Sequence, residues 1–248
     1  MVCGKLSVKD KEIYMFSFKR FAAFVMTAVL AVSTVVAQDD DREMSVEQSY
    51  LQYSIEVMII RETARANSRE QKLIALEYIG DAIAHGNTSE DIRLTLEYLS
   101  SEGRRTVARE NGRLMNNFPE IRRQSARYLG QLGTEEAQSA LLQICQFENE
   151  PMVLQEVIKA LGDIGINQDN ETIANIAWVM RRFNNLNPDN LMAIATIDTF
   201  EKIAKKNGGI TSPEAIQILI LISEGHYIRP VQERARQLIA ELRSYGGR

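Results

Sequence analysis

Seven arginines lie within 24 consecutive residues near the middle of the chain, and this charge cluster stands out from the surrounding sequence. The same stretch holds two acids, Glu110 and Glu120, so its local charge is +5. Guanidinium groups bind carboxylates through pairs of parallel hydrogen bonds. The cluster therefore indicates an anion-docking surface. Its arginines are Arg104, Arg105, Arg109, Arg113, Arg122, Arg123 and Arg127.

The spacing of these arginines indicates which of them share a face. Residues four apart on a helix lie on the same side. Arg123 and Arg127 have this spacing, and so do Arg105, Arg109 and Arg113, along a helix expected at 104–115. We predict a docking surface for an acidic peptide, a carboxylate-bearing envelope polymer or a partner protein. Two structural alternatives stay open: a solvated helix surface, or arginines paired to acids of an adjacent repeat. The predicted binding residues are Arg105, Arg109, Arg113, Arg122, Arg123 and Arg127, with Asn116 and Asn117 in the following connection.

The other residues capable of chemistry form no recognisable site. His85 and His226 each lie beside a glycine at an expected helix end, where the helix dipole favours a cation. Neither has a His, Cys or carboxylate four positions further along the chain, and no nucleophile, phosphate-loop or dinucleotide motif is present. Cys145 is expected to be a small apolar core residue. We predict no catalytic residues, no metal and no cofactor.

The N-terminus has the pattern of an export signal. Lys19 and Arg20 precede an uncharged apolar run, which ends in small residues at Ala37. The run from Phe21 to Ala37 is 17 residues long, at the lower limit of the roughly 17–25 that span a membrane. We therefore predict a signal peptide at 1–37, cleaved between Ala37 and Gln38, with 1–14 read as a misassigned start.

Export defines the expected location of the chain. The protein would be periplasmic or secreted, and an acidic, disordered leader is expected at 38–44. The alternative is an uncleaved signal that acts as an N-terminal membrane anchor, which would be the chain's only membrane contact.

Composition and charge narrow the function classes. The 248 residues carry 29 Lys and Arg against 33 Asp and Glu, a net charge of −4. Residues 1–37 hold five of the basic and two of the acidic residues, so the remainder has a net charge of −7. This acidic balance and the predicted export disfavour nucleic acid as a partner. Two cysteines, one of them in the signal, exclude a disulfide scaffold.

Apolar residues recur at spacings of three and four, which predicts an all-α protein. The chain's five prolines each precede or begin an amphipathic run, the place where proline is tolerated in a helix. A capping box is expected at Thr211 and Glu214. The predicted helices are 45–65, 69–85, 89–101, 104–115, 119–131, 135–147, 151–164, 170–183, 190–206, 213–224 and 229–244.

Two copies of one motif lie 32 residues apart, at 119–133 and 151–165. Each begins with proline and reaches Leu-Gly ten residues later, with a second glycine three positions after the first. The second glycine, Gly133 or Gly165, is expected to end the helix. The first, Gly130 or Gly162, lies in the last helical turn, where the missing side chain lets a neighbouring helix approach.

The first copy resembles HEAT repeats, in particular the short bacterial type also found in phycobilin-lyase-like proteins. The resemblance rests on Pro119-x-Ile121-Arg122-x3-Ala126-x2-Leu129-Gly130-x2-Gly133. It extends over 119–165 and, more loosely, over 69–244. It implies a right-handed α-solenoid of stacked antiparallel helix pairs, with about five irregular repeats in a single domain at 45–248.

Such solenoids are usually protein-binding scaffolds, because stacked repeats present a large surface. We therefore expect a noncatalytic scaffold in the cell envelope that binds a protein partner or an extended anionic polymer. The alternative is an envelope enzyme or enzyme subunit, of lyase or hydrolase type, whose site is assembled across repeats.

Overall fold

The computed structural model describes residues 46–105, 107–184 and 188–245, with side chains from residue 54 onward. Contacts along the chain define two units, Met1–Gln52 and Tyr53–Arg248, and the packing described below is that of the second. The predicted signal peptide, its cleavage site at Ala37 and Gln38, and the leader at 38–44 lie outside the described residues.

Ten α-helices follow one another along the described chain, which confirms the all-α class. A short hairpin interrupts them between α4 and α5, and a single 3-10 turn, η1 (Gln168–Asn170), precedes α8. The helices are α2 (Val46–Arg65), α3 (Arg69–Ala84), α4 (Glu90–Ser100), α5 (Pro119–Leu132), α6 (Glu135–Phe147), α7 (Pro151–Ile164), α8 (Glu171–Asn184), α9 (Asn190–Asn207), α10 (Pro213–Glu224) and α11 (Arg229–Tyr245).

Proline marks helix starts as predicted. Pro119, Pro151 and Pro213 are the first residues of α5, α7 and α10. A proline in the first turn costs little, because the backbone N–H that it lacks would have no intrahelical acceptor there. One expected cap is displaced by a residue: the N-cap of α10 is Ser212 rather than Thr211, and the Ser212 hydroxyl accepts a hydrogen bond from the N–H of Glu214.

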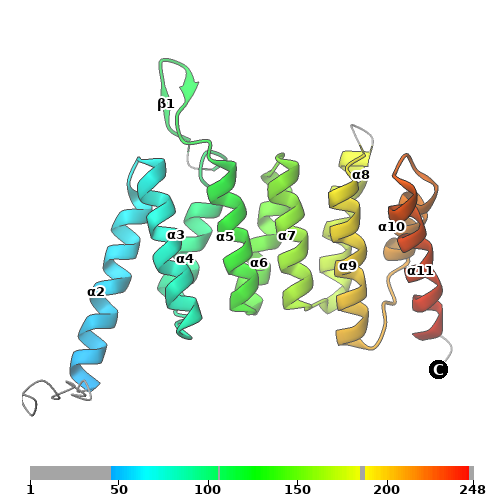
Figure 1. The fold of residues 1–248 in the computed structure, drawn as a ribbon, viewed down its shortest axis with the longest axis horizontal. Helices are drawn as coiled ribbons and strands as arrows, with labels where there is room; N and C mark the ends of the chain where they lie inside the picture. The colour runs from blue at the N-terminus through cyan, green and yellow to red at the C-terminus, as the bar shows by residue number, and fades with distance from the viewer. Residues whose placement is uncertain (1–45, 106, 185–187, 246–248) are drawn as a thin grey trace, which may run out of the picture. The chain divides into compact units, whose positions relative to one another are not determined.

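The helices of the second unit form two layers (Figure 1). Helices α3, α5, α7, α9 and α11 pack side by side in sequence order, and α4, α6, α8 and α10 pack against them as the other layer. From α4 onward the chain thus groups into four successive pairs, from α4/α5 to α10/α11. This arrangement is a solenoid of helix pairs, as the sequence predicts.

Glycine allows the close approach of neighbouring helices in the first of these layers. A Cβ atom on Gly130 of α5 would lie 2.7 Å from the Cβ of Ala160 in α7, and one on Gly162 of α7 would lie 3.0 Å from the Cα of Thr199 in α9. Gly133 ends α5 in the left-handed conformation, with φ +70°. Both roles predicted for the paired glycines are confirmed.

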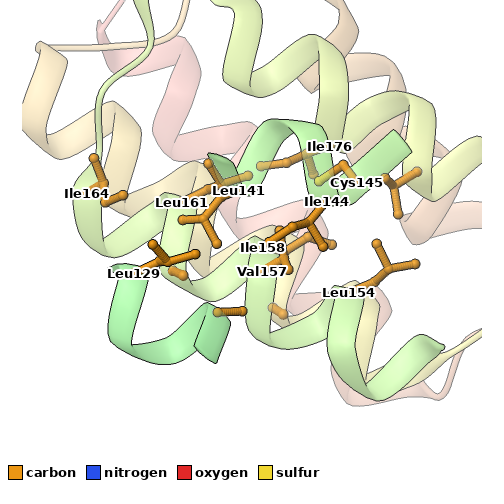
Figure 2. Close-up of a cluster of buried hydrophobic side chains, with 14 of the residues drawn as sticks. Leu129, Leu141, Ile144, Cys145, Leu154, Val157, Ile158, Leu161, Ile164 and Ile176 are labelled. Carbon is orange, nitrogen blue, oxygen red and sulfur yellow. The ribbon is translucent and has the colours of Figure 1, made fainter. Parts of the chain in front are cut away.

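The core between the layers is continuous and apolar. Figure 2 shows part of it, a cluster of buried side chains that includes Leu129, Leu161, Ile144 and Cys145. Cys145 is fully buried, which confirms its prediction as a core residue.

The prediction of a helix at 104–115 is wrong. This segment contains a hairpin of two short antiparallel strands, β1 (Arg109–Glu110) and β2 (Arg113–Leu114), in which Glu110 pairs with Arg113. Asn111 and Gly112 form the two-residue turn, with φ of +48° and +80°. Asparagine and glycine tolerate this left-handed backbone, so the turn closes a hairpin and stops a helix. The hairpin projects beyond the ends of the neighbouring helices (Figure 1).

Candidate interaction site

The predicted arginine cluster divides among three environments in the structure. Two of its members enter a buried polar network, three belong to the insertion between α4 and α5, and two lie on the exposed side of α5. In that order they are Arg104 and Arg122, then Arg105, Arg109 and Arg113, then Arg123 and Arg127.

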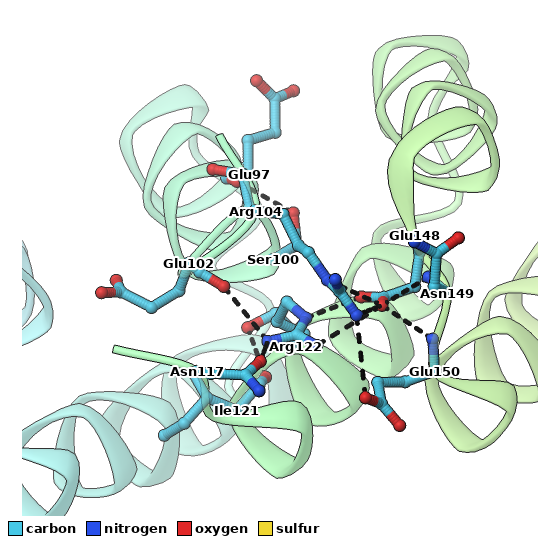
Figure 3. Close-up of polar contacts among 12 residues, drawn as sticks. Glu97, Ser100, Glu102, Arg104, Asn117, Ile121, Arg122, Glu148, Asn149 and Glu150 are labelled. Carbon is cyan, nitrogen blue, oxygen red and sulfur yellow. Dashed lines mark hydrogen bonds and ion pairs between the residues drawn. The ribbon is translucent and has the colours of Figure 1, made fainter. Parts of the chain in front are cut away.

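Arg122 lies inside the protein rather than on a docking surface, so its predicted binding role is wrong. Its side chain is 0% exposed. Its Nε donates to Oε2 of Glu148 at 2.6 Å, and one terminal nitrogen donates to the carbonyl oxygen of Glu102 at 3.1 Å (Figure 3). A buried guanidinium must be paired and hydrogen-bonded. The arginine of the repeat motif is therefore structural here.

Glu148, in the turn between α6 and α7, collects contacts from three helix pairs. Besides Arg122 it pairs with Arg104 at 3.0 Å and accepts a backbone hydrogen bond from the N–H of Glu150 at 2.9 Å (Figure 3). Its carbonyl oxygen accepts a hydrogen bond of 2.6 Å from Arg182 of α8. Burial alone would raise the pKa of the Glu148 carboxyl, but the hydrogen bonds from Arg122 and the backbone outweigh burial and lower it.

A second buried ion pair fixes the start of the insertion. Lys72 of α3 lies 2.9 Å from Glu102 and donates a hydrogen bond of 2.9 Å to the carbonyl oxygen of Ala64. The amide of Asn116 donates to Oε1 of Glu102 at 2.7 Å, and its oxygen accepts from the N–H of Ala108 at 2.9 Å. Glu102 and Asn116 thus hold the two ends of the insertion together.

The two asparagines predicted to bind a partner serve the fold. Asn116 is buried within the network just described, so its expected place on a docking surface is wrong. Asn117 is exposed, and its side-chain oxygen accepts a hydrogen bond of 3.0 Å from Arg122.

The insertion arginines are exposed, although not as one helical row. Arg105 lies over the Phe147 ring at 5.9 Å from its centroid and contacts Gln143, while Arg109 donates to the carbonyl oxygen of Gly112 at 3.3 Å. Arg113 is exposed on β2. None of the three arginines forms an ion pair with a residue that the structure describes.

Arg123 and Arg127 occupy one exposed side of α5, as their spacing predicts. Arg127 donates to Glu156 of α7 at 2.8 Å. Pairing to acids of an adjacent repeat, one of the two structural alternatives, therefore applies to Arg104, Arg122 and Arg127. Arg123 has no ion pair within the described part of the chain.

Arg127 also borders a groove of about 510 Å³ that crosses α5, α7 and α9. Four basic and four acidic side chains line it, together with Ala160 and Thr199. Ala160 lies against Gly130, and Thr199 lies against Gly162. The groove therefore follows the same three helices whose close approach these glycines allow. The charged lining residues are Arg127, Glu156, Lys159, Asp163, Asp198, Glu201, Lys202 and Lys205.

Opposite charges alternate across this groove and pair between helices. Lys202 of α9 contacts Asp163 of α7 at 2.6 Å, and Arg234 of α11 pairs with Glu201. Lys159 forms no ion pair with a described residue. Apart from Arg127, the residues of this groove are not predicted by sequence analysis, because they come from three helices and share no local motif.

The histidines remain apart from these clusters. His85 is exposed at the end of α3, where its Nδ1 lies 2.7 Å from the carbonyl oxygen of Asp81, and His226 is exposed after α10. Within the described ranges, no three His, Cys, Asp or Glu side chains are grouped to hold a metal ion. None of the helices described is both long and apolar enough to span a membrane.

The Cys145 thiol is expected to be unreactive in the folded protein. Burial raises its pKa to about 12, and thiols react as thiolates. In a Cys3→Ser variant, a thiol reagent such as 5,5′-dithiobis(2-nitrobenzoic acid) should modify Cys145 only after denaturant is added. Labelling in buffer as fast as in denaturant would contradict this burial.

Stability is expected to fall in acid partly through Glu148. Its pKa in the fold lies below the ordinary value of 4.5, so the ionised carboxylate stabilises the fold above that pH, and this contribution is lost as pH falls through the lowered pKa. Glu148→Gln should be less stable than the wild type at pH 7, and the difference should narrow below about pH 4.5. Urea denaturation across this range measures it. Glu110→Gln on the exposed hairpin is the control, and a constant difference for Glu148→Gln would refute the expectation.

Comparison with protein families agrees with the geometry. Residues 113–185 match the family model of HEAT repeats, a segment that contains α5, α6, α7 and α8. Together with the stacked helix pairs, this match shows that the chain contains HEAT repeats, in the segment from the end of the hairpin through α8. No curated protein matches the chain.

Proposed function

We propose that this protein is a noncatalytic scaffold, exported to the cell envelope, that binds a protein partner on the layer formed by α5, α7 and α9. HEAT repeats generally mediate protein interactions. The observation that carries the proposal is the groove of about 510 Å³, because it crosses three successive helix pairs and so uses the repeat architecture itself.

The charges of the groove favour a protein over a polyanion. Four basic and four acidic side chains line it, so a uniformly anionic polymer would meet as much repulsion as attraction. A protein segment with charges of both signs can complement this pattern, and such complementarity selects partner and register. The export signal that the sequence predicts at 1–37 supports location in the envelope.

Photocrosslinking in the native host tests the scaffold. A photoreactive residue replaces Gln131, which lines the groove, or Gln237, an exposed glutamine of α11 outside it. We expect one defined protein adduct from position 131 and none from position 237, with the partner then identified by mass spectrometry. Equal adducts at both positions, or none at 131, would refute groove binding. An anionic polymer recovered in place of a protein would refute the choice of partner.

The export part has its own test. Fractionation of the host should place the chain outside the cytoplasm, with an N-terminus at Gln38. A chain recovered in the cytoplasm with residues 1–37 intact would refute export and leave the groove proposal standing.

A further inference from the structure

The exposed arginines of the insertion lack the acidic partners that other members of the cluster have. Arg104, Arg122 and Arg127 are each ion-paired to a glutamate. Arg105, Arg109 and Arg113 form no ion pair with any described residue. The insertion therefore exposes three guanidinium groups and a single carboxylate, that of Glu110 opposite Arg113 in the strand register, on a chain whose net charge is negative.

The insertion is fixed at its base although its tip projects into solvent. A two-stranded hairpin is at best marginally stable alone. Here Asn116 bonds to Glu102 and to the Ala108 N–H, and Glu102 pairs with buried Lys72. Gly103 packs so closely that a Cβ on it would lie 2.3 Å from the Asn116 carbonyl oxygen. A base fixed in this way lowers the ordering cost that binding would otherwise carry.

Apolar side chains accompany these arginines. Val107 is 46% exposed and Met115 is 49% exposed, on the two arms of the insertion. Methionine and arginine are both enriched in protein interfaces. A ligand that matched the insertion would carry carboxylates for the guanidinium groups and apolar side chains for Val107 and Met115.

We propose that the β1–β2 hairpin is a second docking element, which binds an acidic, leucine-containing segment of a protein partner through Arg105, Arg109, Arg113, Val107 and Met115. The carboxylates of the segment pair with the guanidinium groups, and its apolar side chains cover Val107 and Met115. This inference rests on the proposed scaffold function and adds the chemistry of the partner at a site outside the groove.

A defined peptide tests the proposal. The purified full chain is titrated into a short fluorescein-labelled peptide of alternating glutamate and leucine, and anisotropy is recorded. We expect saturable binding that weakens with salt, since salt screens exposed charges, and none to the corresponding lysine-leucine peptide. Arg109→Glu with Arg113→Glu should weaken binding about tenfold or more, because each pair then becomes repulsive. Arg109→Gln with Arg113→Gln should weaken it less, and Met115→Ser should weaken it without changing its salt dependence.

A matched control separates the hairpin from overall charge. Arg229→Glu with Arg243→Glu makes the same charge change on exposed α11 positions, and it should leave the affinity unchanged. Equal loss in both double variants, or no binding of the glutamate-leucine peptide by the wild type, would overturn the proposal. Tighter binding of oligogalacturonate would also overturn it, in favour of a polymer. If the cross-link at position 131 persists in those cases, the groove scaffold stands and only the hairpin proposal fails.

Discussion

Replacing Arg122 with alanine is expected to lower the free energy of unfolding by about 3–5 kcal/mol. The guanidinium is fully buried and hydrogen-bonds to Glu148, Glu102 and Asn117. Removal of the guanidinium takes away the cation closest to the buried Glu148 carboxylate, which then has only Arg104 as an ion-pair partner. A buried charge without full compensation is among the costliest defects in a fold. Guanidinium chloride denaturation, followed by circular dichroism, measures the loss.

The neighbouring residue supplies the control for this prediction. Arg123 is exposed and forms no ion pair with a described residue, so Arg123→Ala should change stability by no more than about 0.5 kcal/mol. A double-mutant cycle that combines Arg122→Ala with Glu148→Gln should give a coupling free energy of about 0.5–3 kcal/mol between the two residues. Equal denaturation midpoints for Arg122→Ala and Arg123→Ala would show that the buried pair does not stabilise the fold.

Gly130→Ala is expected to destabilise the protein by about 1–3 kcal/mol, the usual cost of overpacking. Helix propensity alone would predict the opposite result, because alanine is about 1 kcal/mol more favourable than glycine within a helix. A loss of stability would therefore indicate that the close contact outweighs propensity. The added methyl group would lie 2.7 Å from Ala160 Cβ and 2.9 Å from its Cα, so α5 and α7 must separate. Thermal or chemical denaturation of the full chain would detect the loss.

A compensating substitution tests whether this contact is the cause. Ala160→Gly removes the nearer of the two atoms, so in its presence Gly130→Ala should cost less than it does alone. A Gly130→Ala protein more stable than the wild type would mean that helix propensity decides and that α5 and α7 are not held in close contact at this position.

The helical framework could be predicted because its signals are local. Pro151 and Gly165 bound α7, and each acts through the backbone of its own position: proline through its missing N–H and glycine through a positive φ, here +67°. The predicted bounds of α6, α7 and α10 equal those observed.

The hairpin was missed because two local signals compete in the same segment. The four-residue spacing of Arg105, Arg109 and Arg113 matches a helix face, whereas Asn111-Gly112 is a strong signal for a two-residue turn. The turn prevails, since both of its residues adopt positive φ, which a helix does not allow. That dipeptide is the local signal from which the hairpin can be predicted.

The candidate sites were only partly predictable, because burial and pairing depend on distant residues. Arg122 and Arg123 are adjacent and chemically identical, yet one is buried and the other exposed. Arg122 lies on the buried side of α5, with Ala126 and Leu129, and its buried partner Glu148 is 26 positions away in sequence. The groove likewise joins side chains of α5, α7 and α9. No motif within a single repeat specifies either arrangement.

The convergence of Arg122, Glu148 and Arg182 limits how this chain could gain or lose repeats. A solenoid unit that touches only its neighbours can be duplicated or deleted with little effect on the rest. Here the α6/α7 pair carries the carboxylate and carbonyl that bind arginines of the pairs on both sides. Deletion of that pair would leave a buried cation without its acceptor, so changes in repeat number are expected at the ends of the stack, not at its centre.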